Sequence, residues 1–306
     1  MSSRVQNRVL DRGARSRLLR KDKEGVASTV GTIMALLVFI AFMALITNSY
    51  VPAWMMDNER AHMNQVTDQF GELKGKVDSM VVQWTIRGGL SSNMYAPIAL
   101  GSAGVPLFAT PTIGILTYSP VGSSGSSISM SFTPDGSKAE TIEGGGRVEL
   151  YCPNRYYVQQ WLVYENGAII MGQEDGQTMR ACPNLEFSKV GEKVNIHFTQ
   201  IDLVGDSQSR SGSDSVGLNI ELIYVDMQSY TLNGEWTLTL NTAYGMAWEN
   251  YLKESLGEVG LEESTGYELN RVNSQTEGIT TITLTINNPN TLFHDRATVR
   301  MSGARG

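Results

Sequence analysis

The sequence predicts an α+β protein, with a long N-terminal transmembrane and amphipathic helix followed by a mainly antiparallel β-sandwich that carries one further helix. Three patterns predict this. Residues 26–56 hold no charged side chain, the following segment repeats apolar residues at helical spacing, and the rest alternates apolar and polar residues between turn residues. The expected divisions are a basic cytoplasmic leader (1–25), a transmembrane helix (26–50), an amphipathic stalk helix (51–88) and an extracellular β-rich domain (89–306).

Charge is distributed unevenly along the chain. The net charge of the 306 residues is −7, yet residues 1–25 hold eight basic and three acidic side chains and so carry +5. The remaining residues therefore carry −12. A basic tail can bind nucleic acid, but the apolar segment that follows favours a membrane topology, so we expect no nucleic-acid partner and membrane lipid instead.

The apolar segment Val26–Ile46 is long enough to cross a bilayer. As a helix, its 21 residues would span about 30 Å, the thickness of the hydrocarbon core. Tyr50 and Trp54 follow where an aromatic belt would meet the outer headgroups, and the basic leader would keep the N-terminus in the cytoplasm. A buried soluble helix and a cleaved secretory signal are the alternatives. The 31 uncharged residues argue against the first, and the absence of a clear small-x-small site after Ile46 argues against the second.

Beyond Pro52, which should interrupt or bend the helix, apolar residues recur in steps of three and four. This spacing predicts an amphipathic helix that ends at Gly88-Gly89. The stripe could pack on the protein's own β domain or on a neighbouring subunit. Three heptads are short for an autonomous coiled coil, so intramolecular packing is favoured. The stripe consists of Met63, Val66, Phe70, Leu73, Val77, Met80 and Trp84.

The remaining chain reads as strands with one helix. Asn166-Gly167 lies between two apolar runs and predicts a hairpin, because both residues tolerate positive φ. The polar stretches Gly122–Ser127 and Asp206–Ser215 are expected to be loops, and Gly144–Gly146 a turn. The other predicted elements are strands at 128–132, 148–152, 194–201, 216–225, 235–240, 278–286 and 297–301 and a helix at 243–256.

Two cysteines, Cys152 and Cys182, fall in the expected exterior domain. An even pair outside the cell predicts a disulfide; two free thiols, or a metal or catalytic role, are the alternatives. No histidine lies at a metal-type spacing from either cysteine, so no metal site is expected.

The sequence contains none of the common catalytic motifs, and we expect no enzymatic activity and no cofactor. Glu174-Asp175 and Glu262-Glu263 could hold a cation or act as an acid–base pair, but adjacent loop carboxylates are usually solvated. His294-Asp295 could pair a base with an orienting acid, although adjacent side chains seldom point the same way. His197 should lie on the exposed face of a strand.

The leader ends in Lys23-Glu24-Gly25 directly before the apolar segment. Together with the stretches Val51–Trp54, Glu59–Lys74 and Tyr164–Ile170, this makes most of the chain similar to archaeal type IV pilin-like membrane-anchored proteins with a class III signal peptide. The resemblance implies that a prepilin peptidase cuts between Gly25 and Val26, and that the exposed helix then packs with other pilin-like subunits. Two departures are Glu24, where a basic residue is common, and Val30 at the fifth mature position.

Two functions follow. The first is a non-enzymatic pilin-like structural or cell-surface protein, anchored by one helix and assembled in a filament or pseudopilus. The alternative is a membrane-tethered extracellular module that binds a protein or glycan through loops such as Tyr151–Tyr157.

Overall fold

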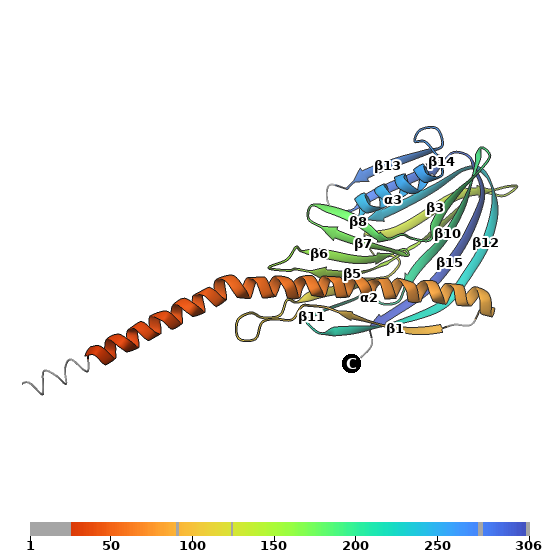
Figure 1. The fold of residues 1–306 in the computed structure, drawn as a ribbon. Coiled ribbons are helices and arrows are strands. Elements are labelled where there is room, and N and C mark those ends of the chain that lie inside the picture. The colour runs from red at the N-terminus through yellow and green to blue at the C-terminus, as the bar shows by residue number, and fades with distance from the viewer. Residues whose placement is uncertain (1–25, 90–91, 124, 275–277, 304–306) are drawn as a thin grey trace, which may run out of the picture. The chain divides into compact units, whose positions relative to one another are not determined.

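The computed structural model describes residues 26–89, 92–123, 125–274 and 278–303 (Figure 1). The chain divides into two compact units, Met1–Trp54 and Met55–Gly306. The predicted leader and its processing residue Gly25 lie outside the described residues. Both the long apolar N-terminal helix and the mostly antiparallel β domain are present, so the predicted fold class is confirmed.

The N-terminal helix is continuous from Val26 to Ile86. It comprises helical residues 26–45, a π turn η1 (Ile46–Tyr50) and α2 (Val51–Arg87). The predicted interruption at Pro52 does not occur. In the π turn, the N–H of Val51 donates to the carbonyl of Ile46, five residues earlier. Such a local π adjustment lets a helix accommodate a proline, which has no N–H to donate.

The described residues of the β domain form two sheets. The larger runs β13–β14–β12–β15–β10–β9, with β1 and β3 also paired to β12, and β4 to β3. Its strands are β1 (Ser92–Ala99), β3 (Ser126–Pro134), β4 (Glu140–Gly145), β9 (Leu185–Val190), β10 (Lys193–Val204), β12 (Ser215–Thr242), β13 (Tyr267–Asn273), β14 (Thr280–Ile286) and β15 (Pro289–Gly303).

The smaller sheet runs β11–β2–β5–β6–β7–β8. The predicted hairpin is its β6–β7 pair, with Asn166 and Gly167 both at positive φ. Among the described strand pairs only β10–β15 is parallel. The strands of this sheet are β2 (Gly114–Ser119), β5 (Arg147–Cys152), β6 (Gln160–Glu165), β7 (Ala168–Gln173), β8 (Gly176–Ala181) and β11 (Gln208–Gly212).

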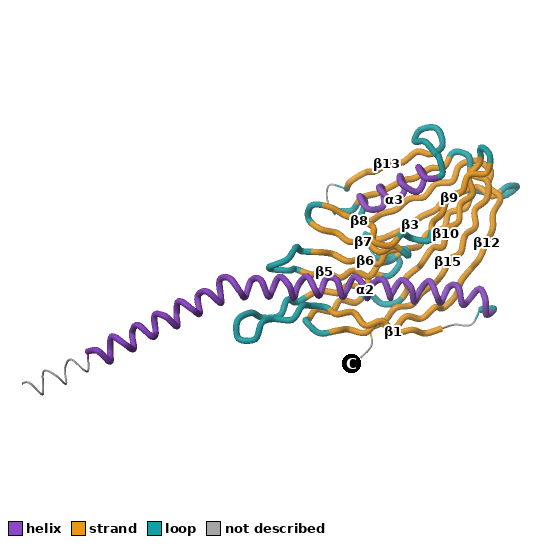
Figure 2. Tube along the Cα trace, in the orientation of Figure 1, coloured by secondary structure: helices purple, strands orange, loops and turns teal. Residues whose placement is uncertain are grey.

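Each helix of the β domain fills its own core. In Figure 1, α2 crosses β5 and β15, which belong to different sheets, and its buried stripe forms one cluster with residues of both. The second helix, α3 (Gly245–Glu258), appears beside β8 and β13 in Figure 2. Its Trp248 and Leu252 belong to the other cluster, with residues of β3, β9 and β14. Strand β12 contributes to both clusters and so joins the two cores.

The glycines 144–146 form the crossing from the larger sheet to the smaller one. Gly144 and Gly145 end β4, and β5 begins at Arg147. Gly145 and Gly146 have φ of 122° and 99°. The turn predicted at residues 144–146 is wrong for Gly144 and Gly145, which belong to β4, and Gly146 alone connects the two strands. Gly144 passes directly over the buried Asp202, whose carboxylate accepts the N–H of Gly145.

We expect Gly144→Ala to lower the free energy of unfolding by about 1–3 kcal/mol, because the new methyl group would overlap the Asp202 carboxylate. Gly176→Ala is the matched control, since nothing lies within 4 Å of a Cβ there. Urea unfolding of both variants measures the difference. Equal stability of the two would show that the crossing tolerates a side chain.

Candidate functional site

The uncovered apolar helix is the first candidate functional element. Helical residues 26–45 carry large side chains that are at least half exposed, such as Val38 at 70% and Met34 at 62%. The segment is long and apolar enough to cross a membrane, and none of its most apolar window is buried within the protein. The remaining large apolar side chains exposed here are Val26, Val30, Ile33, Leu36, Leu37, Phe39, Ile40, Phe42 and Leu45.

Two threonines of this helix have hydrogen-bond partners within the helix itself. The hydroxyl of Thr32 donates to the carbonyl of Ser28 at 2.7 Å, and that of Thr47 donates to the carbonyl of Met43 at 2.9 Å. Polar groups inside a bilayer require partners within the protein, because lipid tails offer none. These threonines are therefore compatible with a hydrocarbon environment.

The predicted packing stripe on α2 faces the domain's own core. Six of its seven members are at most 2% exposed, and the seventh, Trp84, packs partly buried against the same cluster. The Trp84 ring meets Tyr224 of β12 edge-on, with centroids 5.7 Å apart. The prediction of intramolecular packing is confirmed.

Glu59 of α2 is a buried carboxylate that holds two loops. Its Oε1 accepts the hydroxyl of Thr112 (2.7 Å) and the N–H of Arg155 (3.0 Å). Its Oε2 accepts the N–H groups of Tyr156 (2.8 Å) and Tyr157 (2.7 Å). Thr112 lies in the β1–β2 loop, residues 100–113, and the other donors lie in the β5–β6 loop, residues 153–159. One side chain therefore fixes both loops to the helix.

The hydrogen bonds at Glu59 outweigh the effect of burying it. Burial would raise the pKa of Glu59, but the donations from Arg155, Thr112, Tyr156 and Tyr157 together bring that pKa below its ordinary value. The folded protein thus stabilises the ionised, carboxylate form of Glu59.

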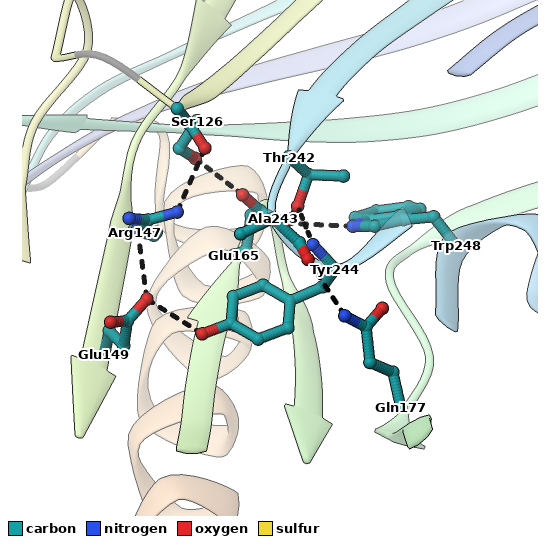
Figure 3. A network of polar contacts seen from close by, with 10 residues as sticks. Ser126, Arg147, Glu149, Glu165, Gln177, Thr242, Ala243, Tyr244 and Trp248 are labelled. Carbon is teal, nitrogen blue, oxygen red and sulfur yellow. Dashed lines mark hydrogen bonds and ion pairs between the residues drawn. The ribbon is translucent and has the colours of Figure 1, made fainter. Parts of the chain in front are cut away.

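A second buried carboxylate, Glu165, joins the two sheets to α3 (Figure 3). It ends β6 and accepts the hydroxyls of Ser126 and Thr242, each at 2.7 Å, and the indole N–H of Trp248 at 3.0 Å. Beside it, the Tyr244 hydroxyl donates to Glu149. The adjoining cavity measures about 10 Å³, which is room for one water and no substrate. We interpret this network as structural.

We expect the stability of the protein to fall as pH rises from the ordinary pKa of glutamate, in part because of Glu165. Burial raises the pKa of Glu165, against the lowering effect of Thr242, Ser126, Trp248 and Arg147. The folded protein therefore keeps a proton that the unfolded chain has already lost, and stability declines over that pH range.

Glu165→Gln removes this titration and should flatten that part of the pH profile. Glu186→Gln is the control, because Glu186 is an exposed residue of β9. The measurement is the free energy of unfolding from urea titrations between pH 4 and pH 8. A Glu165→Gln profile as steep as that of the wild type would contradict the assignment.

The predicted disulfide between Cys152 and Cys182 is not formed, and both cysteines are free thiols. Cys152 ends β5 and Cys182 follows β8, with β6 and β7 between them. Three strand spacings amount to about 14 Å, whereas a disulfide requires Cα atoms within about 7 Å. The prediction rested on the even cysteine count, which carries no information on strand order.

Only one of the two thiols should react in the folded protein. Burial, followed by the charge of Glu59, raises the pKa of Cys152 to about 12, while Cys182 is exposed. An aromatic disulfide reagent should therefore release one equivalent from the native chain and two after denaturation. Cys182→Ser should abolish the native reaction; a persisting fast equivalent would place Cys152 at the surface.

The other polar candidates do not assemble into a reactive site. His294 is buried and its Nε2 lies 3.2 Å from Gln200 Oε1, whereas Asp295 is only half-buried on the alternate face of β15. Glu174, Asp175, Glu262 and Glu263 are exposed, and so is His197, which stacks on Phe293. No group of three metal-type side chains is present among the residues that the structure describes.

Comparison of the chain with protein-family models and with curated protein sequences found no match.

Proposed function

We propose that this chain is a non-enzymatic, pilin-like surface protein of the archaeal type IV class. It is anchored by residues 26–46, with the N-terminus in the cytoplasm and the β domain outside. A prepilin peptidase cuts it between Gly25 and Val26, and the exposed helix then packs with those of other subunits in a filament or pseudopilus. The observation that carries the proposal is the long helix, uncovered and apolar in its first part and built into the β domain by its later stripe.

The energetics of the uncovered part support this. Full burial of a large aliphatic or aromatic side chain is worth about 1.5–3 kcal/mol. For the large apolar side chains of residues 26–45, even the exposed fraction amounts to roughly 10–20 kcal/mol in total. This is comparable to the whole stability of a typical domain, which favours a segment covered by lipid or by neighbouring apolar helices.

Membrane anchoring is tested by fractionation of cells that express the full chain. The protein should stay in the membrane pellet through alkaline carbonate extraction, and protease added to intact cells should degrade the β domain. A chain found in the soluble fraction would overturn the proposal, and a protease-resistant domain would overturn the topology.

Processing is tested at the predicted junction. The mature N-terminus should be Val26 in the wild type, and Gly25→Arg should leave the leader attached because only a compact residue fits the peptidase. Gly13→Arg, within the same leader, is the matched control and should be processed normally. A wild-type chain that starts near Met1 would contradict the processing step.

One groove favours the alternative of a tethered binding module. It encloses about 510 Å³ on the outer side of β1, β12 and β15, and it is lined by Asn93, Tyr95, Asn219, Glu221 and Arg300 together with Met94 and Ser302. An exposed tyrosine among amides and an ion pair suits a polar ligand such as a glycan. An anchored, uncut and monomeric protein whose ligand binding is lost in Tyr95→Ala would favour this alternative over the filament subunit.

A further inference from the structure

The two loops bound to Glu59 are linked to each other, and we name them together the collar. It comprises residues 100–113 and 153–159. Besides the four hydrogen bonds to Glu59, Asn58 Nδ2 donates to the carbonyl of Ala103 at 3.1 Å. Arg155 Nη1 lies 3.4 Å from the hydroxyl of Thr110 and links one loop to the other. The collar is thus attached to α2 at two consecutive residues.

The collar exposes apolar side chains at its tips. Leu107 is fully exposed, at the end of a small hairpin closed by hydrogen bonds between Val105 and Ala109. Its φ is +69°, a conformation that is unfavourable for leucine and easy for glycine or asparagine. Both the backbone conformation of Leu107 and the exposure of its side chain to water are unfavourable. A partner that covers the side chain would offset this cost. The other exposed apolar members are Phe108, Ile113, Tyr156 and Val158.

The charge of the collar differs from that of the rest of the domain. Residues 100–113 contain no charged side chain, and residues 153–159 contain only Arg155. The chain beyond the leader carries −12 in total, so this is an uncharged to weakly positive surface on an acidic domain. Aromatic and aliphatic tips with a single arginine match the composition of segments that lie at a membrane–water interface.

The position of the collar along the chain identifies the partner. Asn58 and Glu59 follow Trp54, the residue expected at the outer headgroups, by four and five residues of continuous helix. At 1.5 Å per residue this is about 6–8 Å of helix axis. The points at which both loops are attached to α2 therefore follow the expected outer headgroup residue by about one to one and a half helical turns along the chain.

We propose that the collar is a lipid-docking surface, in which Leu107 and Phe108 enter the headgroup–acyl boundary of the bilayer that the N-terminal helix spans. Arg155 then faces the phosphates of anionic lipids, and Glu59 positions both loops for this contact. The inference rests on the membrane anchor of the proposed function. It adds a second attachment, which fixes the orientation of the β domain against the membrane before any assembly.

The test uses the full chain, reconstituted in phosphatidylcholine–phosphatidylglycerol vesicles that contain a doxyl-labelled lipid as quencher. An environment-sensitive fluorophore is attached to Leu107→Cys in a Cys182→Ser background. The control site is Ser137→Cys, in the exposed turn between β3 and β4. This turn is hydrogen-bonded to β12 at Thr231. The collar is hydrogen-bonded to the residue just before β12, because the N–H of Leu100 donates to the carbonyl of Asp214. The two sites are therefore separated by roughly 50 Å of strand.

The label at residue 107 should be quenched at least threefold more than the label at residue 137, with a blue-shifted emission. Flotation of the same sample shows whether the protein is anchored. Equal quenching at both sites in a protein that floats would overturn the docking and leave the anchor intact. Excimer formation between pyrene labels at residue 107, without lipid quenching, would also overturn it, because a second copy would then cover the collar. A protein that fails to float would overturn the anchor, and the docking with it.

Discussion

Phe70→Ala is expected to lower the free energy of unfolding of the β domain by about 3–5 kcal/mol, the usual cost of emptying a buried aromatic site. Phe70 lies in the middle of the α2 stripe, is completely buried, and packs in the cluster that both sheets share. Tryptophan fluorescence during urea unfolding in mild detergent measures the loss.

Gln65→Ala on the exposed side of the same helix is the matched control and should change stability by less than about 0.5 kcal/mol. The Phe70→Ala loss should also be independent of protein concentration, because the stripe packs within one chain. A loss that disappears on dilution would indicate contacts between subunits instead. Equal effects of the two substitutions would contradict the packing of α2 in the core.

The elements that sequence predicts well are those whose pattern reflects burial directly. The α2 stripe keeps one side chain of each helical turn in the core, and α3 was placed within two residues of its actual ends, Gly245 and Glu258. By contrast β11 contains only Gln, Ser, Arg and Gly, and it is a strand because it pairs with β2. Its residues were predicted to be a loop, since nothing in a polar sequence indicates a partner strand that is distant along the chain.

Strand β12 runs without a break through a segment where the sequence predicts the end of one strand and the start of another. Two strands are predicted from the sequence, one ending at Val225 and the other beginning at Glu235, and the pair Asn233-Gly234 between them is of a type common in hairpin turns. Gly234 does have positive φ, at 95°, and the pairing with β3 shifts register between Leu232 and Trp236. The chain makes a bulge there and continues in the same strand, because β3 pairs with it on both sides of the bulge, at Leu232 and again from Trp236 to Thr242.

Of the buried carboxylates Glu59 and Glu165, only Glu59 could have been found from the sequence. It lies four residues before Met63 and so continues the 3-4 spacing of the apolar stripe. A charged residue in that phase must either end the buried face or find partners inside it. Glu165 has no comparable signal. It precedes the Asn166-Gly167 turn, where glutamates are commonly solvated, and its three donors come from distant parts of the chain.

Glu59→Ala is expected to lower the free energy of unfolding by about 3–5 kcal/mol. Removal of the carboxylate leaves the N–H groups of Arg155, Tyr156 and Tyr157 without their acceptor, and each unsatisfied buried group costs about 1–3 kcal/mol. Three such groups would together cost about 3–9 kcal/mol. Water can reach the partly exposed loop and satisfy some of them, so the expected loss lies in the lower part of that range. Glu72→Ala, at an exposed position of the same helix, should have little effect.

The charge of Glu59, separately from its shape, is tested with Glu59→Gln across pH. Because the folded protein holds the pKa of Glu59 below its ordinary value, the stabilisation is complete above that ordinary value and disappears as pH falls through the lowered pKa. The wild type should therefore lose stability more steeply than Glu59→Gln in urea titrations between pH 5 and pH 2.5, with Glu72→Gln tracking the wild type. This acid loss runs opposite to the effect of Glu165, whose ionisation destabilises the fold as pH rises. If Glu59→Gln followed the wild-type profile throughout, the two loops would be held by their own contacts, and Glu59 would not position them.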